Sequence, residues 1–154
     1  MKRYLILFAL MFSTGLAQAQ EDLFQKYSGQ DGVSTVYISK TMFEMIPIVE
    51  SIGLNLVNMK GKISSIQMLS TERPSLAQKM HQETSKMVGK QHEELMRITE
   101  GPKKTTFYIK KKGETIRELL MISDANDGFS LILLTGEFTL KEIQEITSAQ
   151  TEAQ

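Results

Sequence analysis

The chain has 154 residues, in which 18 lysines and arginines balance 18 aspartates and glutamates, and it contains no cysteine. A nucleic-acid-binding protein would carry a clear basic excess, so the charge balance argues against that class. The lack of cysteine excludes disulfides, thiolate catalysis and cysteine-ligated zinc.

Residues 1–19 have the pattern of a secretory signal peptide. Two basic residues precede an apolar run, and Ala17–Ala19 places small residues where signal peptidase needs them. The apolar run is shorter than the roughly 20 residues that a membrane-spanning helix needs, so an uncleaved membrane anchor is the weaker alternative. No cysteine follows the run, which excludes a lipid-modified N-terminal cysteine. We expect cleavage after Ala19 and a periplasmic or secreted chain without a membrane span.

The first part of the expected mature chain alternates strands and helices. Residues 20–32 are polar and predict a flexible leader. Val33–Ser39 is rich in β-branched residues and predicts a strand. A short helix should follow, because Thr41 and Glu44 have the spacing of a capping box. The stretch up to residue 62 has no clear period and should be irregular.

A second strand and a longer helix follow. The strand is predicted at Ile63–Thr71, and the helix begins at Arg73-Pro74-Ser75 and extends to about Val88, where Gly89 is a natural stop. From His92 onward, tight turns separate four predicted strands, which are Glu93–Thr99, Lys103–Lys111, Thr115–Ser123 and Phe129–Thr135.

The last predicted element is a helix that begins at a second capping box, formed by Thr139 and Glu142. The order β-α-β-α-β-β-β-β-α predicts an α+β fold with a single mixed, mostly antiparallel sheet and packed helices. Residues 33–147 should form one domain, and residues 148–154 should be a frayed tail.

Turn geometry assigns the apolar residues of the last four strands to two sheet faces. With Lys112-Gly113 as a two-residue turn, one face is predicted to carry the core residues Phe107, Ile109, Ile116, Leu120, Ile122, Phe129, Leu131 and Leu133. The second face is also apolar and is predicted to carry Arg117 and the candidate binding residues Tyr108, Leu119, Met121, Ile132 and Leu134. Such a face needs either a helix of the same chain or a second molecule to cover it. It is therefore the candidate surface for a protein partner or a homo-oligomer.

Five lysines lie between Gly101 and Glu114. They could form a site for an anion, or they could be solvated strand ends that prevent strands from pairing with other chains. Since the lysines fall at both ends of one strand and on both of its faces, the sequence favours solvated strand ends.

These segments also resemble a known family. The signal peptide, "GVSTVYISKTMFEMI", "KISSIQMLST", "FYIKKKGETIRELLMI" and "LILLTGEFTLKEIQEI" resemble the domain of unknown function 4252 family of exported proteins from Bacteroidetes-type bacteria. The resemblance covers residues 33–147. It implies a periplasmic or envelope protein without an established activity, and its motifs carry no catalytic residues.

Little else in the sequence indicates chemistry, and we predict no catalytic residue, metal or cofactor. His81 and His92 are the only histidines, and neither has metal-ligand spacing to another. Asp124–Gly128 lacks the glycine and glutamate positions of a calcium loop. The sequence favours a non-enzymatic exported domain that acts through protein or envelope contacts. The alternative is a small-ligand-binding or hydrolytic protein with a pocket between sheet and helices, built from the residues His81, His92, Asp124 and Asp127.

Overall fold

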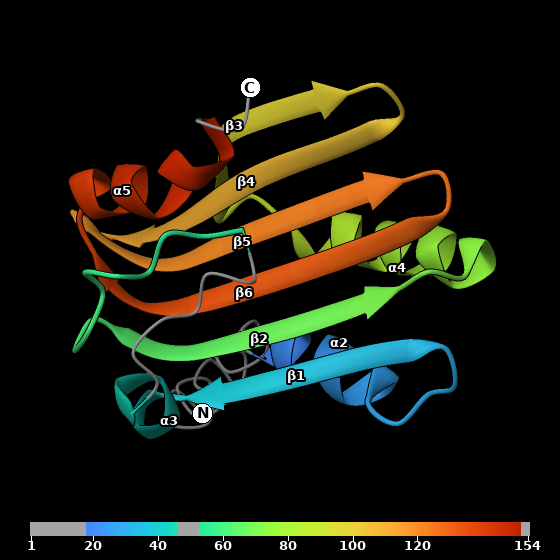
Figure 1. Ribbon diagram of the computed structural model, residues 1–154, viewed down its shortest axis with the longest axis horizontal. Helices are drawn as coiled ribbons and strands as arrows, with labels where there is room; N and C mark the ends of the chain where they lie inside the picture. Colours follow the sequence, from blue (N-terminus) through green and yellow to red (C-terminus); the bar gives the residue numbers. More distant parts are fainter. Residues whose placement is uncertain (1–17, 46–52, 152–154) are drawn as a thin grey trace, which may run out of the picture.

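The computed structural model describes residues 18–45 and 53–151 of the protein and shows one six-stranded sheet with helices on both faces (Figure 1). The strands are β1 (Val33–Ser39), β2 (Ile63–Thr71), β3 (His92–Glu100), β4 (Lys103–Lys112), β5 (Thr115–Ala125) and β6 (Gly128–Phe138). The described helices are α2 (Gln18–Tyr27), α3 (Lys40–Met45), α4 (Pro74–Met87) and α5 (Leu140–Thr151).

The sheet has the strand order β1-β2-β6-β5-β4-β3, and each neighbouring pair is antiparallel. The predicted α+β class with a single sheet is therefore confirmed. The sheet is antiparallel throughout rather than mixed, because β1 and β2 pair antiparallel around the short helix α3. The last strand of the meander, β6, lies between β5 and β2 and joins the two halves of the chain.

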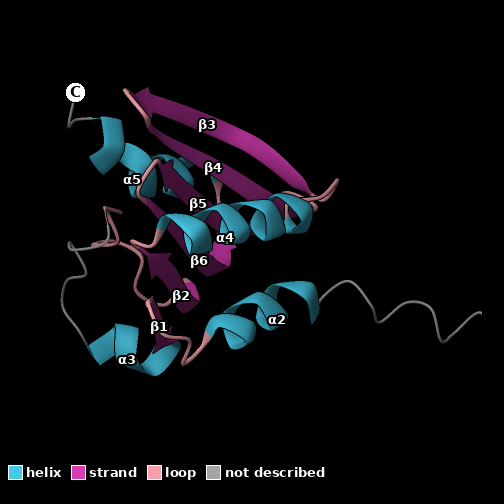
Figure 2. Cartoon of the chain, turned by 90° about the vertical axis from the view of Figure 1, so that its right-hand side faces the viewer, coloured by secondary structure: helices cyan, strands magenta, loops and turns pink. Residues whose placement is uncertain are grey.

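The helices form one layer on each side of the sheet. Helices α2 and α4 lie on one side, which we call the rear face, whereas α5 lies on the opposite, front face (Figure 2). The segment of residues 53–62, which is irregular as predicted, also covers the front face (Figure 1). None of the helices within residues 18–45 and 53–151 is long and apolar enough to cross a membrane.

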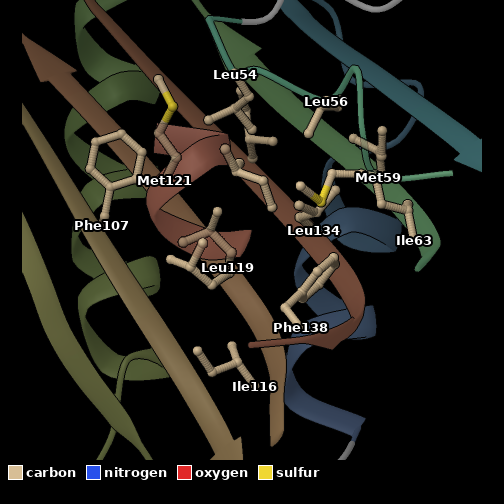
Figure 3. Packing of buried hydrophobic residues seen from close by; sticks show 14 of the residues in the cluster. Leu54, Leu56, Met59, Ile63, Phe107, Ile116, Leu119, Met121, Leu134 and Phe138 are labelled. Atoms are coloured by element: carbon tan, nitrogen blue, oxygen red, sulfur yellow. The ribbon is translucent and has the colours of Figure 1, made fainter. Parts of the chain in front are cut away.

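The larger hydrophobic core lies on the front face (Figure 3). Segment 53–62 contributes Leu54, Leu56 and Met59, and α5 contributes Ile143 and Ile146. The backbone N–H of Asn55 donates to the carbonyl of Ile146 at 2.9 Å, which ties the segment to the helix. The sheet contributes the buried apolar residues Ile63, Ile66, Phe107, Ile109, Ile116, Leu119, Met121, Ile132, Leu134 and Phe138.

A second core fills the rear face. The buried residues of the helices are Leu23, Phe24 and Tyr27 from α2, and Ala77 and Met80 from α4. They pack against the sheet residues Leu69, Leu120, Phe129, Leu131 and Leu133. Because both faces are buried, the inner strands are apolar on each side instead of alternating between apolar and polar residues.

The predicted core face is correct for Phe107, Ile109 and Ile116, which share the front face, but wrong beyond Ile116. The residues Leu120, Ile122, Phe129, Leu131 and Leu133, which were predicted on that same face, lie on the rear face. The turn residues are Gly113-Glu114, since Lys112 pairs with Thr115. A bulge between Ile116 and Glu118 then adds one residue to β5. Since side chains alternate faces along a strand, one extra residue moves everything beyond it to the other face.

The bulge divides the candidate binding residues between the two faces. Leu119, Met121, Ile132 and Leu134 share the front face with Phe107 and Ile109, whereas Tyr108 lies on the rear face. All four front-face side chains are buried under the chain's own residues. The prediction that this face needs a cover is met by α5 and segment 53–62, so these residues are part of the core and not a free surface.

The predicted flexible leader is a helix. Residues 18–27 form α2, whose Leu23, Phe24 and Tyr27 side chains are buried against the rear face. The Tyr27 hydroxyl donates to Oε2 of Glu83 in α4 at 2.9 Å, and Nζ of Lys26 lies 2.6 Å from Oε1 of the same carboxylate. Burial and the neighbouring carboxylate of Glu83 raise the pKa of Tyr27 to about 12. The hydrogen bond from Lys26 lowers the pKa of Glu83. Together, the contacts of Lys26 and Tyr27 with Glu83 hold α2 against α4.

One of the two predicted capping boxes is present. The backbone N–H of Thr139 donates to Glu142 at 2.8 Å, and the backbone N–H of Glu142 donates to the Thr139 hydroxyl at 3.3 Å. Hydrogen bonds from Lys62 and from the Thr139 backbone lower the pKa of Glu142. At α3, however, the cap is Ser39, whose hydroxyl accepts from the Met42 backbone at 3.2 Å. The helix therefore begins earlier than the spacing of Thr41 and Glu44 predicts.

Candidate functional site

A pocket of about 230 Å³ lies on the rear face, between α4 and the strands β4 and β5. Helix α4 and the residue that ends it line one wall with His81, Thr84, Ser85 and Val88. The sheet lines the other wall with Lys104, Thr106, Tyr108, Ile122 and Asp124. Alternate residues of β4 and β5 point toward α4, so the even-numbered positions of both strands share this wall.

The pocket brings two of the predicted site residues together. Nδ1 of His81 lies 2.9 Å from Oδ2 of Asp124, which is an ion-pair distance when the imidazole is protonated. Nδ1 makes no aligned hydrogen bond within the described part of the chain, so the contact is one of charge and proximity. The imidazole also packs edge-on against the Phe129 ring, with the centroids 6.5 Å apart. The histidine is therefore held at one end of the pocket.

Hydroxyl groups form the polar part of the helical wall. Ser85 donates to the carbonyl of His81 at 2.8 Å, as serine often does within a helix. Thr84 does not, and its buried Oγ1 has no hydrogen-bond partner among the described residues. Leaving a buried hydroxyl without a hydrogen bond costs about 1–3 kcal/mol. A polar ligand atom that hydrogen-bonds to Thr84 would remove this cost, which favours binding.

The charge in the pocket is unevenly shared. Asp124 is occupied by His81, whereas no carboxylate of the described residues lies within salt-bridge distance of the Lys104 ammonium. The lysines between Gly101 and Glu114 therefore differ in their partners. Lys110 lies 3.5 Å from Glu118 and Lys111 lies 3.2 Å from Glu93, whereas Lys104 has no such carboxylate among the described residues. Lys104 is the cation that the pocket offers to an anion, while Val88, Ile122 and the Tyr108 ring supply its apolar surface.

The other predicted site residues lie elsewhere. Nε2 of His92 lies 3.4 Å from Oε2 of Glu118, in a half-buried row that Lys110 completes across β3, β4 and β5. Asp127 lies exposed in the turn between β5 and β6. Within residues 18–45 and 53–151, no three histidine, aspartate or glutamate side chains gather closely enough to hold a metal ion.

Sequence reasoning missed part of the pocket. Thr84 is buried on the inward side of α4, and Lys104 is one of the five lysines for which the sequence favours solvated strand ends. Helix α4 packs on β6 and β2, and both residues lie at the pocket because the later part of α4, from His81 onward, lies opposite β4 and β5. Only Tyr108 of the candidate binding residues lines it. A polar residue on the inward side of a helix, such as Thr84, is a further signal of a site, beside His81 and Asp124.

A protein-family model described as Domain of unknown function (DUF4252) matches residues 27–146, which is more than half of the chain. No curated protein and no solved structure matches it. The match begins at Tyr27, the last residue of α2, and extends to Ile146 of α5, so it spans the whole sheet and the pocket.

Proposed function

The chain belongs to the DUF4252 family, and we propose that it is an exported protein that binds a small amphiphilic carboxylate. The single observation that carries the binding proposal is the pocket, in which the unpaired Thr84 hydroxyl and the Lys104 ammonium accompany an apolar surface. A carboxylate would accept hydrogen bonds from both donors, and its apolar part would pack on Val88, Ile122 and Tyr108.

Binding is favoured over hydrolysis by the hydrogen bonds of the helical wall. A serine nucleophile needs its hydroxyl within hydrogen-bond reach of a basic imidazole. The Ser85 hydroxyl instead donates to the backbone carbonyl of His81. Within the described residues, neither the Ser85 nor the Thr84 hydroxyl is hydrogen-bonded to the His81 imidazole. We therefore assign His81 and Asp124 to the recognition of a ligand, and not to the activation of a nucleophile.

Contact with a partner through an apolar sheet face, which the sequence favoured, has less support. That function needed the side chains of Leu119, Met121, Ile132 and Leu134 to meet another molecule, and all four are buried within the chain. The pocket is a separate feature on the opposite side of the sheet.

The first prediction tests ligand class. Nuclear magnetic resonance titration with benzoate should shift the backbone amides of residues around the pocket, with a dissociation constant near the millimolar range expected for so small a ligand. Benzamide and benzylamine, which have the same ring without the carboxylate, should bind more weakly. Lys104→Gln should weaken benzoate binding about three- to tenfold, because it removes one charge-assisted hydrogen bond.

Two matched variants control this experiment. Lys103→Gln removes a lysine that does not line the pocket and should leave the affinity unchanged. Ser85→Trp places a large ring over the pocket and should abolish binding, whereas Gln82→Trp, on an exposed position of the same helix, should not. Equal affinities for benzoate and benzamide would contradict the carboxylate, and shifts confined to other residues would contradict the pocket.

Export rests on the N-terminal sequence pattern, and it gives the second prediction. When the full-length gene is expressed in a Gram-negative bacterium, the protein in the periplasmic extract should begin at Gln20 or within a few residues of it. Ala19→Leu should block this cleavage, because signal peptidase requires a small residue at that position. Purified protein that begins at Met1 in the wild type would contradict the proposal.

A further inference from the structure

The two edges of the sheet differ in how they are protected against pairing with another strand. Edge strand β3 has four charged residues, Glu93, Glu94, Arg97 and Glu100, and a bulge between Glu94 and Met96. Charges and bulges are the usual devices that keep an edge strand from pairing. Edge strand β1 has the sequence VSTVYIS, with neither a charge nor a proline, and its register with β2 is continuous.

Strand β1 also exposes apolar side chains. Val36 is 43% exposed and Tyr37 is 66% exposed. Helix α3 follows directly at the end of β1 and exposes Met42 and Met45 (Figure 1). Within the described residues, β1 pairs with β2 alone, so its outer row of backbone groups faces away from the sheet. This edge therefore combines unprotected hydrogen-bonding groups with apolar surface.

We propose that two copies of this chain pair through β1, antiparallel, around a two-fold axis at Val36. The sheets of the two copies would then join into one continuous sheet, and each β1 would become an inner strand. A closed two-fold contact uses the same patch on both copies, so it ends with the dimer.

The residue order of β1 suits pairing with itself. Around an axis at Val36, the two Val36 side chains lie opposite each other, and Thr35 of each copy lies opposite Tyr37 of the other. Aromatic and β-branched residues are favourable cross-strand partners. No charged residue in β1 opposes another, so a second copy introduces no repulsion along the strand. In this register a small residue lies opposite a larger one on each side of the axis, Ser34 opposite Ile38 and Thr35 opposite Tyr37, so a second copy of β1 fits against the first.

A groove beside β1 would receive the aromatic ring. The groove has a volume of about 320 Å³ and lies between α2 and β1, where Phe24, Gln25 and Ser28 face Thr35 and Tyr37. In the proposed register, Tyr37 of the second copy lies beside Thr35, which lines this groove. The groove is on the rear face, on the same side of the sheet as α2, and is separate from the carboxylate pocket.

The mass of the purified protein in solution tests this proposal. Sedimentation equilibrium of the protein produced from the full-length gene should give twice the monomer mass. Val36→Lys places two ammonium groups opposite each other at the axis and should raise the dissociation constant of the dimer at least tenfold. Leu95→Lys makes the same kind of change on edge strand β3 and should leave the dimer intact. Circular dichroism should show that both variants remain folded.

A disulfide crosslink tests whether β1 of a second copy lies against β1, even if Val36→Lys fails to fold. The chain has no cysteine, so Val36→Cys introduces a single thiol. Under oxidation it should form a disulfide-linked dimer at least tenfold faster than Leu95→Cys, because only the former thiols face each other across the axis. A monomeric wild type, growth beyond the dimer, or equal crosslinking of the two variants would overturn the proposal.

Discussion

Replacing Leu134 with lysine should unfold the protein. Leu134 lies in the middle of β6, its side chain is fully buried, and the surrounding front-face core is apolar (Figure 3). A lysine there would bury an ammonium group without a carboxylate partner in that core. We expect a loss of at least about 4–5 kcal/mol in the free energy of unfolding, which is nearly all of the stability of a domain at the lower end of the usual range of about 5–15 kcal/mol.

A matched control separates burial from charge in this experiment. Val57 belongs to the segment that covers the same face, but its side chain is 56% exposed. Val57→Lys should therefore change stability by no more than about 0.5 kcal/mol. Urea unfolding monitored by circular dichroism measures both variants. If Leu134→Lys kept wild-type stability, the front face would be open to solvent and the packing of α5 and segment 53–62 would be wrong.

Replacing Tyr27 with alanine should destabilise the protein by about 3–5 kcal/mol, the usual cost of removing a large buried aromatic side chain. The ring is fully buried between α2 and the rear-face core, and its hydroxyl holds Glu83 of α4. The same urea unfolding experiment measures this loss. A flexible leader would predict almost no effect, so this substitution tests directly whether α2 is part of the fold.

Two further substitutions separate the contribution of the Tyr27 ring from that of its hydroxyl. Tyr27→Phe keeps the ring and removes only the hydrogen bond to Glu83, so we expect a loss of about 1 kcal/mol. Gln25→Ala changes an exposed position of the same helix and should have almost no effect on stability. Equal effects of Tyr27→Ala and Gln25→Ala would show that α2 does not pack on the sheet.

The sequence predicts the elements of this fold better than it predicts their faces. Each predicted strand is present, because β-branched runs and turn residues are local signals. The bulge between Ile116 and Glu118 is not a local signal, since nothing in "TIRELL" distinguishes a bulged strand from a regular one. Helix α2 did have a signal in the i, i+1, i+4 spacing of Leu23, Phe24 and Tyr27. This stripe is short, it lies close behind the signal-peptide pattern, and the polar residues around it have the composition of a leader.

The candidate site is harder to predict for a different reason. His81 and Asp124 were each recognised as residue types suited to a site, but they belong to α4 and β5, which are far apart in the chain. Their 2.9 Å approach depends on where α4 crosses the sheet. That crossing is decided by the packing of Ala77 and Met80 against the rear-face core. No spacing along the sequence contains this information.

The position of β6 between β5 and β2 determines when the sheet can be completed. The four strands β3 to β6 are joined by tight turns, so each of their pairings closes only a short loop. The pairing of β2 with β6 joins Thr71 to Phe129 and closes a much longer one. During synthesis, β1 and β2 emerge early but have no partner on the inner edge of β2 until β6 has followed. The inner edge of β2 must therefore stay unpaired, although its outer edge can pair with β1, until almost the entire chain has been made.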